Sequence, residues 1–155
     1  MDLNLRVRIS DLYAAYAACL DDGRYEDWPE FFTEDAWYRV VPRENHDRGL
    51  PLSTLSLKGK AMMKDRIYGV ESTIFHAPYY QRHLIGVPMM AMHDAHTASV
   101  EVNYCVFRTK RDASSEILSV GRYLDRIEIG DHLKFTQKFC IFDNDMIPNS
   151  LIYPI

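Results

Sequence analysis

The six histidines of this chain are the first residues to test for metal chemistry. His93 and His96 flank Asp94 and form the tightest group of metal-ligand types in the sequence. Zinc and iron sites carried by one chain usually show set spacings, such as H-x3-H or H-E-x2-H on a helix, or a C-x-H pair together with a C-x2-H pair, and none of these occurs here. Residues 92–97 also have the polar composition of a turn. We therefore predict that this chain holds no metal.

Motifs for phosphate binding and covalent catalysis are also missing from the sequence. No G-x-G-x-x-G loop is present, and Gly59-Lys60 lacks the preceding glycine of a phosphate-binding loop. No serine stands in a G-x-S-x-G elbow, and no cysteine has the setting of a nucleophile. Nucleotide binding and acyl transfer are therefore disfavoured.

Acid–base chemistry is the reaction type for which the sequence does offer candidates. Tyr13, Tyr16, Asp35 and His83 could donate or accept protons inside a pocket. Each also has a structural explanation, because the two tyrosines fall on an apolar helix face, Asp35 suits a turn and His83 suits a strand. The residues alone leave both explanations open.

Composition limits the class of protein to which these residues belong. The 155 residues, 47% apolar and 26% charged, are typical of a single globular domain over 1–155. A net charge of −4 disfavours nucleic acid as a partner. The longest apolar run, 12–20, is too short to span a membrane, and a secretory signal is absent, so we expect a cytoplasmic protein. Its three widely spaced cysteines are expected to be reduced.

Helical spacing of apolar residues marks the first part of the chain. Leu5, Ile9, Leu12, Tyr16 and Leu20 recur every three or four residues, which predicts a helix. Gly23 follows as a C-cap. The further elements predicted are helices over 24–32 and 62–70, a strand over 36–41 ending at Pro42, and a long surface loop over 42–57.

The second half of the chain changes to a two-residue period. Apolar residues at even positions alternate with polar ones between 97 and 109, which predicts a half-buried strand. Residues 117–129 and 133–142 continue this pattern, and Gly130-Asp131 is predicted to be a two-residue hairpin turn. Helices followed by a meander of strands predict an α+β fold, with the helices packed on one face of a curved, mostly antiparallel sheet.

Several segments, taken together and in order, resemble the small β subunits of aromatic ring-hydroxylating oxygenases, the Rieske non-haem iron systems. The segments are YEDWPEFFTED at 25–35, YRV at 38–40, PREN at 42–45, KDRI at 64–67, YQRHL at 80–84, VGRY at 120–123 and FD at 142–143. This family has the NTF2-like or cystatin-like cone fold, so the resemblance implies the same helices-then-sheet architecture.

The resemblance implies a division of labour between two chains. In such oxygenases the large α subunit carries the Rieske 2Fe–2S cluster and the mononuclear Fe(II), and electrons arrive from NAD(P)H through a reductase and a ferredoxin. The β subunit helps to build an α3β3 hexamer and is usually not catalytic. Six residues are the interface candidates that this resemblance suggests: Arg43, Arg66, Arg82, His83, Arg122 and Tyr153. Pairing of the arginines within the monomer is the alternative.

Within the family, the segment 42–51 and the ending 146–155 are most similar to small subunits that accompany hydroxylases of single-ring aromatic acids. Salicylate 5-hydroxylase is the first match, followed by terephthalate and anthranilate dioxygenases. The apolar tail 147–155 is expected either to dock against a neighbouring subunit or to pack on its own sheet.

Two other functions remain open from the sequence. A self-sufficient enzyme of the same cone fold, resembling ketosteroid isomerase or scytalone dehydratase, would use His83 and Asp35 as its acid–base pair. A small-molecule carrier would bind without turnover.

Overall fold

A computed structural model of the chain describes residues 1–73, 78–144 and 151–155. Its elements run in the order α1 Leu3–Asp21, η1 Tyr25–Phe31, β1 Phe32–Pro42, α2 Arg43–Asp47, β2 Leu55–Lys58, α3 Lys60–Ser72, β3 Tyr79–Ile85, β4 Met89–Met92, β5 Thr97–Lys110, β6 Glu116–Glu128 and β7 Lys134–Phe142. Here η1 is a 3-10 helix.

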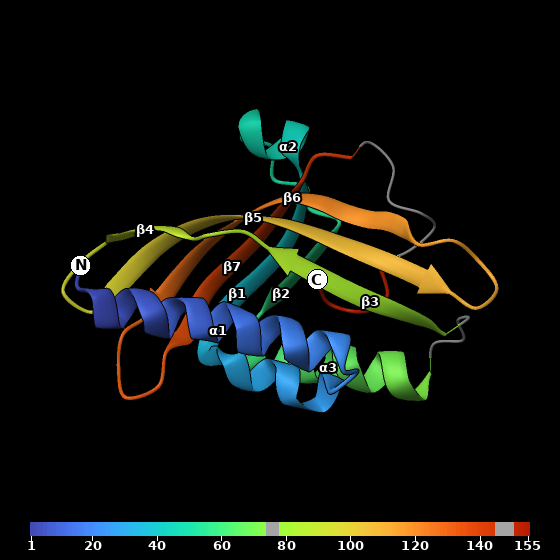
Figure 1. Cartoon of the computed structure of the whole chain (residues 1–155), viewed down its shortest axis with the longest axis horizontal. Coiled ribbons are helices and arrows are strands. Elements are labelled where there is room, and N and C mark those ends of the chain that lie inside the picture. The colour runs from blue at the N-terminus through green and yellow to red at the C-terminus, as the bar shows by residue number, and fades with distance from the viewer. Residues whose placement is uncertain (74–77, 145–150) are drawn as a thin grey trace.

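One curved sheet forms the body of the molecule (Figure 1). Its strand order is β2-β1-β7-β6-β5-β3, and β4 pairs with the remaining part of β5. All pairs are antiparallel except β1 with β7, which are parallel. The predicted α+β class and the mostly antiparallel sheet are confirmed.

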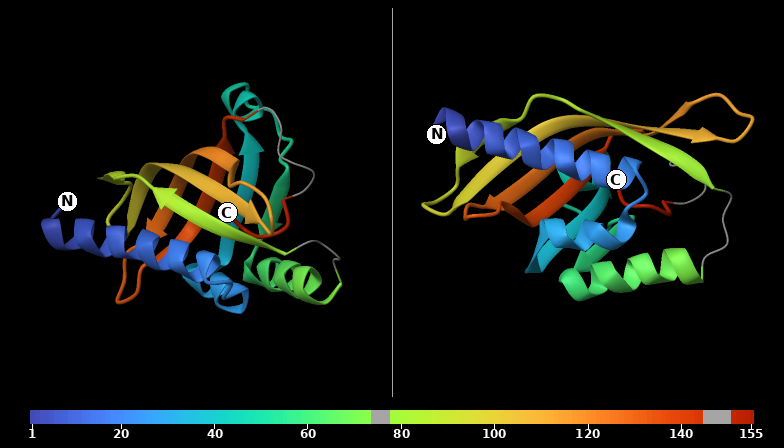
Figure 2. Two further views of the ribbon diagram at one scale, coloured as in Figure 1. Left: turned by 45° about the vertical axis from the view of Figure 1, so that its right-hand side comes forward. Right: turned by 60° about the horizontal axis from the view of Figure 1, so that its bottom comes forward.

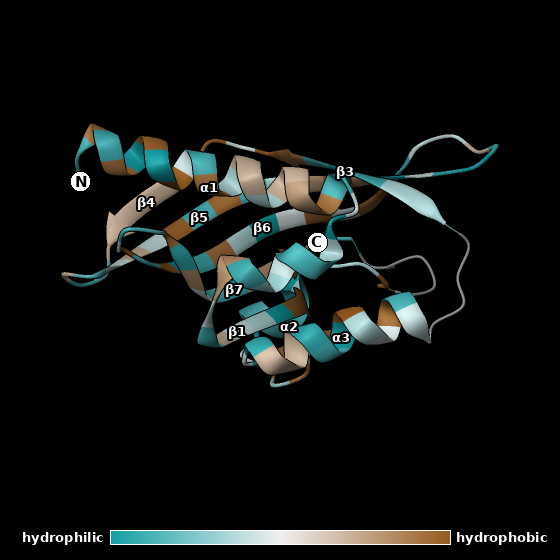
Figure 3. Cartoon of the chain, turned by 90° about the horizontal axis from the view of Figure 1, so that it is seen from below, coloured by the Kyte–Doolittle hydropathy of each residue, from teal (hydrophilic) through white to brown (hydrophobic). Residues whose placement is uncertain are grey.

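The helices α1, η1 and α3 lie together on one side of the sheet, and the short α2 lies on the opposite side (Figures 1 and 2). We call the helix-covered side the inner face and the opposite side the outer face. Along β5 the inner residues Val100, Val102 and Tyr104 are buried, whereas Glu101 and Asn103 point outward. Hydrophobic and hydrophilic residues alternate along the strands for this reason (Figure 3).

Local signals place α1 over the sheet. The side chain of Asp2 accepts a hydrogen bond from the backbone N–H of Leu5 at 2.6 Å and caps the first turn. At the other end Gly23 adopts φ +72°, a left-handed conformation that lets the chain turn sharply into η1. Between these ends the buried residues follow the predicted face: Ile9, Tyr13, Tyr16, Cys19 and Leu20.

Three sequence predictions about local structure need correction. The strand predicted over 36–41 begins earlier, at Phe32, so Asp35, predicted to suit a turn, lies within β1, whose pairing to β7 is irregular before Trp37. The predicted loop 42–57 contains α2 and most of β2. The predicted two-residue turn at Gly130-Asp131 is a connection over 129–133, because β7 starts only at Lys134.

A close approach between β6 and β7 explains the glycine of the VGRY segment. A Cβ added to Gly121 would meet the backbone oxygen of Ile141 at 1.9 Å. Because that neighbour is backbone, it cannot move aside as a flexible side chain could. Only glycine therefore allows the two strands to keep their pairing at this point.

The described end of the chain packs inward. Ile155 is fully buried, and Leu151 is 8% exposed within the same core. Of the two expectations for the tail 147–155, residues 151–155 follow the one in which it packs on its own domain. Residues 147–150 lie outside the described part of the chain.

Candidate functional site

The clearest candidate for acid–base chemistry is a carboxylate–imidazole pair between α1 and β3. Asp21, the last residue of α1, places Oδ1 2.6 Å from Nδ1 of His83. The backbone N–H of His83 also donates to both oxygens of Asp21, at 3.0 and 3.1 Å. The carboxylate of Asp21 lies at the negative end of the helix dipole, which disfavours a second negative charge. The hydrogen bonds from the backbone and the ring of His83 stabilise the carboxylate at this position.

This pair has the geometry in which a carboxylate orients a histidine. A hydrogen bond from Nδ1–H to Asp21 fixes the tautomer and leaves Nε2 as the acceptor, which is the arrangement of a general base. Nε2 has no hydrogen-bond partner within the described residues. The ring of Tyr16 packs edge-on against the imidazole, with centroids 6.5 Å apart.

Burial limits what the pair can do in this conformation. The side chain of His83 is fully buried, and that of Asp21 is 6% exposed. A cavity of about 550 Å³ runs beside α1, with Ser10, Tyr13 and Val87 in its lining together with His83. Since the imidazole is closed to solvent, the pair joins the end of α1 to the edge strand β3 rather than presenting a base to a substrate.

Asp35 does not belong to this site, which corrects the predicted His83–Asp35 pair. Asp35 is exposed on β1, and His83 is buried on β3. Strands β7, β6 and β5 lie between β1 and β3 in the sheet, so the two side chains are separated by several strand spacings of about 4.8 Å each. Asp21 takes the place that the sequence analysis gave to Asp35.

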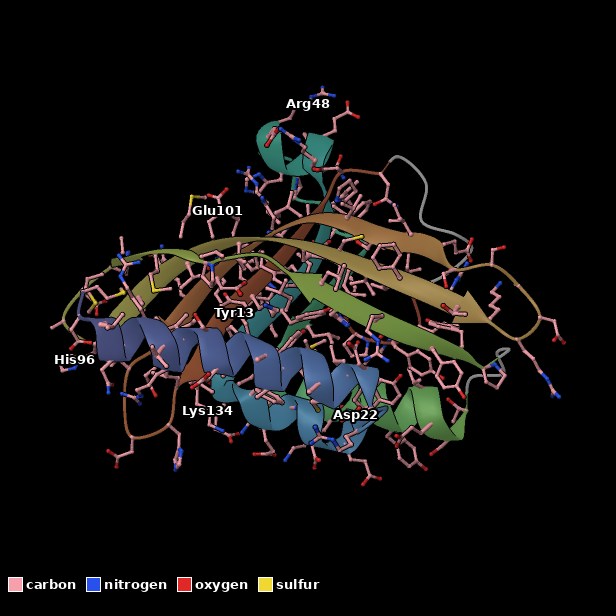
Figure 4. All side chains as sticks on the ribbon, viewed as in Figure 1. Tyr13, Asp22, Arg48, His96, Glu101 and Lys134 are labelled. Atoms are coloured by element: carbon pink, nitrogen blue, oxygen red, sulfur yellow. The ribbon has the colours of Figure 1, made fainter. Side chains whose placement is uncertain are left out.

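A second buried ion pair occupies the middle of the inner face. Nζ of Lys138 lies 2.7 Å from Oδ2 of Asp125, and the hydroxyl of Tyr13 donates to the same oxygen at 2.5 Å. Both charged side chains are completely buried. Figure 4 shows Tyr13 between α1 and the sheet, where it can reach this pair.

Aromatic rings surround the ammonium group of Lys138. Its Nζ lies 3.6 Å from the ring centroid of Tyr123 and 4.6 Å from that of Tyr16, close enough for cation–π attraction. Burial raises the pKa of Asp125, although Lys138 acts in the opposite direction. Burial, followed by the charge of Asp125, also raises the pKa of Tyr13.

The described chain end is hydrogen-bonded to tyrosines of the same core. The hydroxyls of Tyr16 and Tyr38 donate to the backbone oxygen of Ile155 at 2.8 and 3.1 Å. The indole N–H of Trp28 donates to the hydroxyl of Tyr16 at 3.2 Å. Tyr13 and Tyr16, predicted either as acid–base groups or as core residues, are thus hydrogen-bonded core residues here.

Three of the predicted interface residues are engaged inside the chain. Arg66 donates to the backbone oxygens of Leu151 and Ile152, at 2.7 and 3.4 Å, and so holds the end segment. The ring of Tyr153 stacks on that of Tyr25, with centroids 4.4 Å apart and 6° between their planes. His83, the third, is held by Asp21 as described above.

The other three predicted interface residues lie on the surface and have carboxylate neighbours. Arg43 contacts Asp47 at 3.5 Å and Asp143 at 3.4 Å. Arg122 donates to Glu101 at 3.0 Å on the outer face. Arg82 is 72% exposed and lies 3.9 Å from Asp21, at the limit of an ion pair. Exposed ion pairs of this kind contribute only about 0–1 kcal/mol to stability, so these arginines remain free to exchange partners.

Histidine and cysteine side chains do not gather into a metal site in the described part of the chain. Within it, no three His, Cys, Asp or Glu side chains are placed to hold an ion. Asp94 instead accepts a hydrogen bond from the backbone N–H of His96 at 2.8 Å, which is typical of a turn. The cysteines are free thiols, as expected.

Among the residues that the structure describes, no helix is both long enough and apolar enough to span a membrane.

Comparison with known proteins identifies relatives that share the sequence and the fold of this chain. The SnoaL-like domain family matches residues 1–132. The small subunit of anthranilate 1,2-dioxygenase from Burkholderia cepacia is 31% identical over 156 residues, covering 99% of this chain and 96% of that protein. A β subunit of the terminal oxygenase component of terephthalate 1,2-dioxygenase from Comamonas is 29% identical, covering 96% of this chain and 97% of that one.

Among solved structures, the β subunit assigned to an aromatic-ring-hydroxylating dioxygenase of Novosphingobium aromaticivorans superposes with a TM-score of 0.89. It is 35% identical, and the match covers 97% of each chain. This chain therefore has the SnoaL-like fold and belongs to the small β subunits of aromatic ring-hydroxylating dioxygenases. Such a subunit works as part of a multi-subunit oxidoreductase with a large partner chain.

Proposed function

We propose that this chain is the non-catalytic β subunit of an α3β3 Rieske non-haem iron oxygenase that hydroxylates a single-ring aromatic acid, of the salicylate 5-hydroxylase type. The observation that supports a non-catalytic role is the burial of the two polar side-chain pairs on the inner face. His83–Asp21 and Lys138–Asp125 are both buried, with 0–6% of each side chain exposed. In this conformation neither pair presents a solvent-exposed acid or base to a substrate.

The choice of a single-ring aromatic acid rests on the relatives. The names of two relatives give anthranilate and terephthalate as substrates, and these combine one aromatic ring with one and two carboxylate groups, respectively. The preference for salicylate rests on the likeness of segments 42–51 and 146–155 to small subunits of that type.

Iron chemistry is assigned to the large subunit in this proposal. The described residues of this chain offer no three-ligand group that fits a mononuclear iron. The partner would hold the Rieske 2Fe–2S cluster and the Fe(II), and electrons from NAD(P)H would reach it through a reductase and a ferredoxin. Dependence on NAD(P)H would place the assembly in the cytoplasm.

The six interface candidates divide into two roles under this proposal. Arg43, Arg82 and Arg122 are exposed or partly exposed and would form new contacts at subunit boundaries. Arg66, His83 and Tyr153 would keep the surface rigid from inside, because they hold the chain end and the edge strand.

Native mass spectrometry with iron analysis tests the proposal. The tagged chain is isolated from its source cells without denaturation. We expect an iron-containing hexamer in which the second chain is two to three times heavier than this one. An iron-free assembly of this chain alone would contradict the proposal.

A self-sufficient isomerase or dehydratase is the second candidate, now with Asp21 in place of Asp35. The observation in its favour is the oriented His83–Asp21 pair with an unpartnered Nε2. The test is turnover of small ring substrates by the isolated chain and by His83→Ala. Turnover by the wild type that is lost in the variant would support an isomerase or dehydratase. Binding of the substrate without turnover would indicate a carrier. If the chain neither binds nor converts the substrates, the β-subunit proposal stands.

A further inference from the structure

The outer face carries a cluster of cations and aromatic rings at the β1–β2 end of the sheet. Trp37 and Arg39 of β1, Lys58 of β2 and Phe139 of β7 point to this face in adjacent register. We call these four residues the Trp37 cluster. The Lys58 ammonium lies 4.2 Å from the indole centroid, and the Arg39 guanidinium lies 5.0 Å from the same ring and 5.1 Å from that of Phe139.

The two cations of this cluster differ from their neighbours in lacking a carboxylate. On the same side of the molecule, Arg122 is paired with Glu101 at 3.0 Å and Arg43 with Asp143 at 3.4 Å. Within the described residues, neither Arg39 nor Lys58 forms an ion pair. The chain as a whole has a net charge of −4, so the two unpaired cations form a local basic patch on an acidic protein.

Hydrogen bonds orient the cluster beside a groove. The indole N–H of Trp37 donates to the hydroxyl of Ser56 at 2.9 Å, and Nε of Arg39 donates to the hydroxyl of Ser53 at 3.0 Å. Within the described residues the two terminal guanidinium nitrogens of Arg39 form no hydrogen bond, so they are left for another acceptor. A groove of about 510 Å³ lies against them, with Trp37, Arg39, Leu50 and Leu52 in its lining.

We propose that this groove is a docking site for an acidic side chain of the large oxygenase subunit, which places its carboxylate against Arg39. Lys58, which lies over the Trp37 ring that lines the groove, adds a second positive charge. The inference rests on the proposed function, since that function supplies the large partner. Arg and Trp are enriched among the residues that dominate binding energy at interfaces. A fixed guanidinium suits a carboxylate because it can donate two parallel hydrogen bonds.

A second copy of this chain is the other occupant to test. In the proposed α3β3 assembly the copies of this chain would be related by a three-fold axis, so the groove of one copy would meet a different surface of the next copy and not itself. The cross-linking experiment distinguishes such a contact from docking of the large subunit.

Zero-length cross-linking of the intact oxygenase identifies the occupant. A carbodiimide joins a lysine amine directly to a carboxylate, so it reports groups that already form an ion pair. We expect Lys58 to be joined to an Asp or Glu of the large subunit. The control is Lys58→Arg, which keeps the charge but cannot react in this way, and this cross-linked peptide should vanish from it. A cross-link from Lys58 to a second copy of this chain would overturn the choice of partner.

Charge reversal measures the contribution of the groove. The double variant Arg39→Glu, Lys58→Glu is co-produced with the large subunit and compared with Lys110→Glu, Arg111→Glu. The control has the same change in net charge, but it lies at the end of β5, where both residues are exposed. We expect the groove variant to retain at least tenfold less large subunit, and the control to stay within twofold of the wild type. Far-ultraviolet circular dichroism confirms that both variants are folded.

The outcomes separate the two levels of the argument. If the wild-type chain retains no larger iron-containing chain, the proposed function is wrong. If the wild type retains that chain and the groove variant retains it equally well, the proposed function stands and the docking site is wrong.

Discussion

Two lysines on opposite faces of the same sheet show how differently the chain treats a positive charge. Lys138 on the inner face and Lys58 on the outer face each place an ammonium group over aromatic rings, 3.6 Å from the centroid of Tyr123 and 4.2 Å from that of Trp37. Lys138 also has Asp125 at 2.7 Å and no contact with solvent. Lys58 has no carboxylate among the described residues and is exposed.

The difference follows from the cost of burying charge. An ammonium group inside a protein must be paired, because desolvation costs several kcal/mol per ion. A lysine on the surface can remain unpaired, because water solvates it. The Lys138–Asp125 pair therefore stabilises the fold, whereas Arg39 and Lys58 on the outer face are available to bind a partner. Figure 4 shows the same contrast, with Tyr13 enclosed beneath the sheet and Glu101 and Arg48 on its outer side.

Alkaline pH should produce the largest effect, because the inner face holds many acids in their neutral form. Burial raises the pKa of the Cys140 thiol from 9.0 to about 12, and it also raises the pKa values of Tyr16 and Tyr38. The unfolded chain loses these protons first. The stability that they contribute is thus present below pH 9 and is lost as the pH rises toward the folded-state values. Cys140 alone accounts for about 2 kcal/mol by pH 10.5, at about 1.4 kcal/mol per pKa unit.

Urea unfolding at pH 7.5, 9 and 10.5 measures this loss. The variant Cys140→Ala removes one of the neutral acids, so its stability should fall less steeply with pH than that of the wild type. Equal slopes for the two proteins would show that the inner thiol ionises as readily in the folded chain as in the unfolded one.

Breaking the inner ion pair should produce the next largest effect. Lys138→Met leaves Asp125 buried with Tyr13 as its remaining donor, and removal of one partner from a buried pair costs about 3–5 kcal/mol. The double variant Lys138→Met, Asp125→Asn removes both charges and should recover a large part of that loss. Equilibrium unfolding of the two variants and of Asp125→Asn completes a double-mutant cycle. Additive losses would mean that the pair is not coupled.

The sequence predicts α1, η1, α3 and most strands because their apolar periods are strong, and it misses the short α2. It misses the inner ion pair because the register of the last hairpin depends on its turn. A two-residue turn at Gly130-Asp131 would place Asp125 opposite Thr136. The observed connection over 129–133 and the bulge that follows Arg126 place it opposite Lys138. Two charged residues that are 13 positions apart in sequence become partners through a shift of two residues in strand register.

Only one member of the His83–Asp21 pair is predicted from the sequence, because the two residues come together through packing of α1 on β3. His83 was identified, but its partner was assigned to Asp35, in the turn-like stretch before a strand. Asp21 continues the helix face that carries Tyr13 and Ala17, four residues apart, and this spacing is the signal that could have found it. The Trp37 cluster has a weaker signal in the sequence. Arg39 follows Trp37 by two residues in one strand, which places both side chains on one face, but Lys58 joins them only because β2 pairs with β1.

Removing Asp21 should have an intermediate effect. Asp21→Ala leaves both the ring and the backbone N–H of buried His83 without their acceptor, which should lower the free energy of unfolding by about 1–3 kcal/mol. The matched control is Asp22→Ala, because Asp22 is the next residue, is 61% exposed and, within the described residues, forms an ion pair only with Arg24. Its cost should stay within about 0.5 kcal/mol. Thermal unfolding of both variants checks this, and equal losses would show that the carboxylate holding β3 adds nothing specific.

The smallest effect is expected on the outer face, and it completes the comparison of the two lysines. Lys58→Gln and Arg39→Gln each remove a cation over the Trp37 ring, and exposed cation–π contacts contribute only about 0.5–1 kcal/mol. We therefore expect urea midpoints of the isolated chain close to that of the wild type, in contrast to Lys138→Met. A loss above about 2 kcal/mol would mean that the fold itself depends on these cations. A small loss in the monomer together with weak retention of the large subunit would show that the cluster acts on the partner, because the same charges would then matter only when two chains meet.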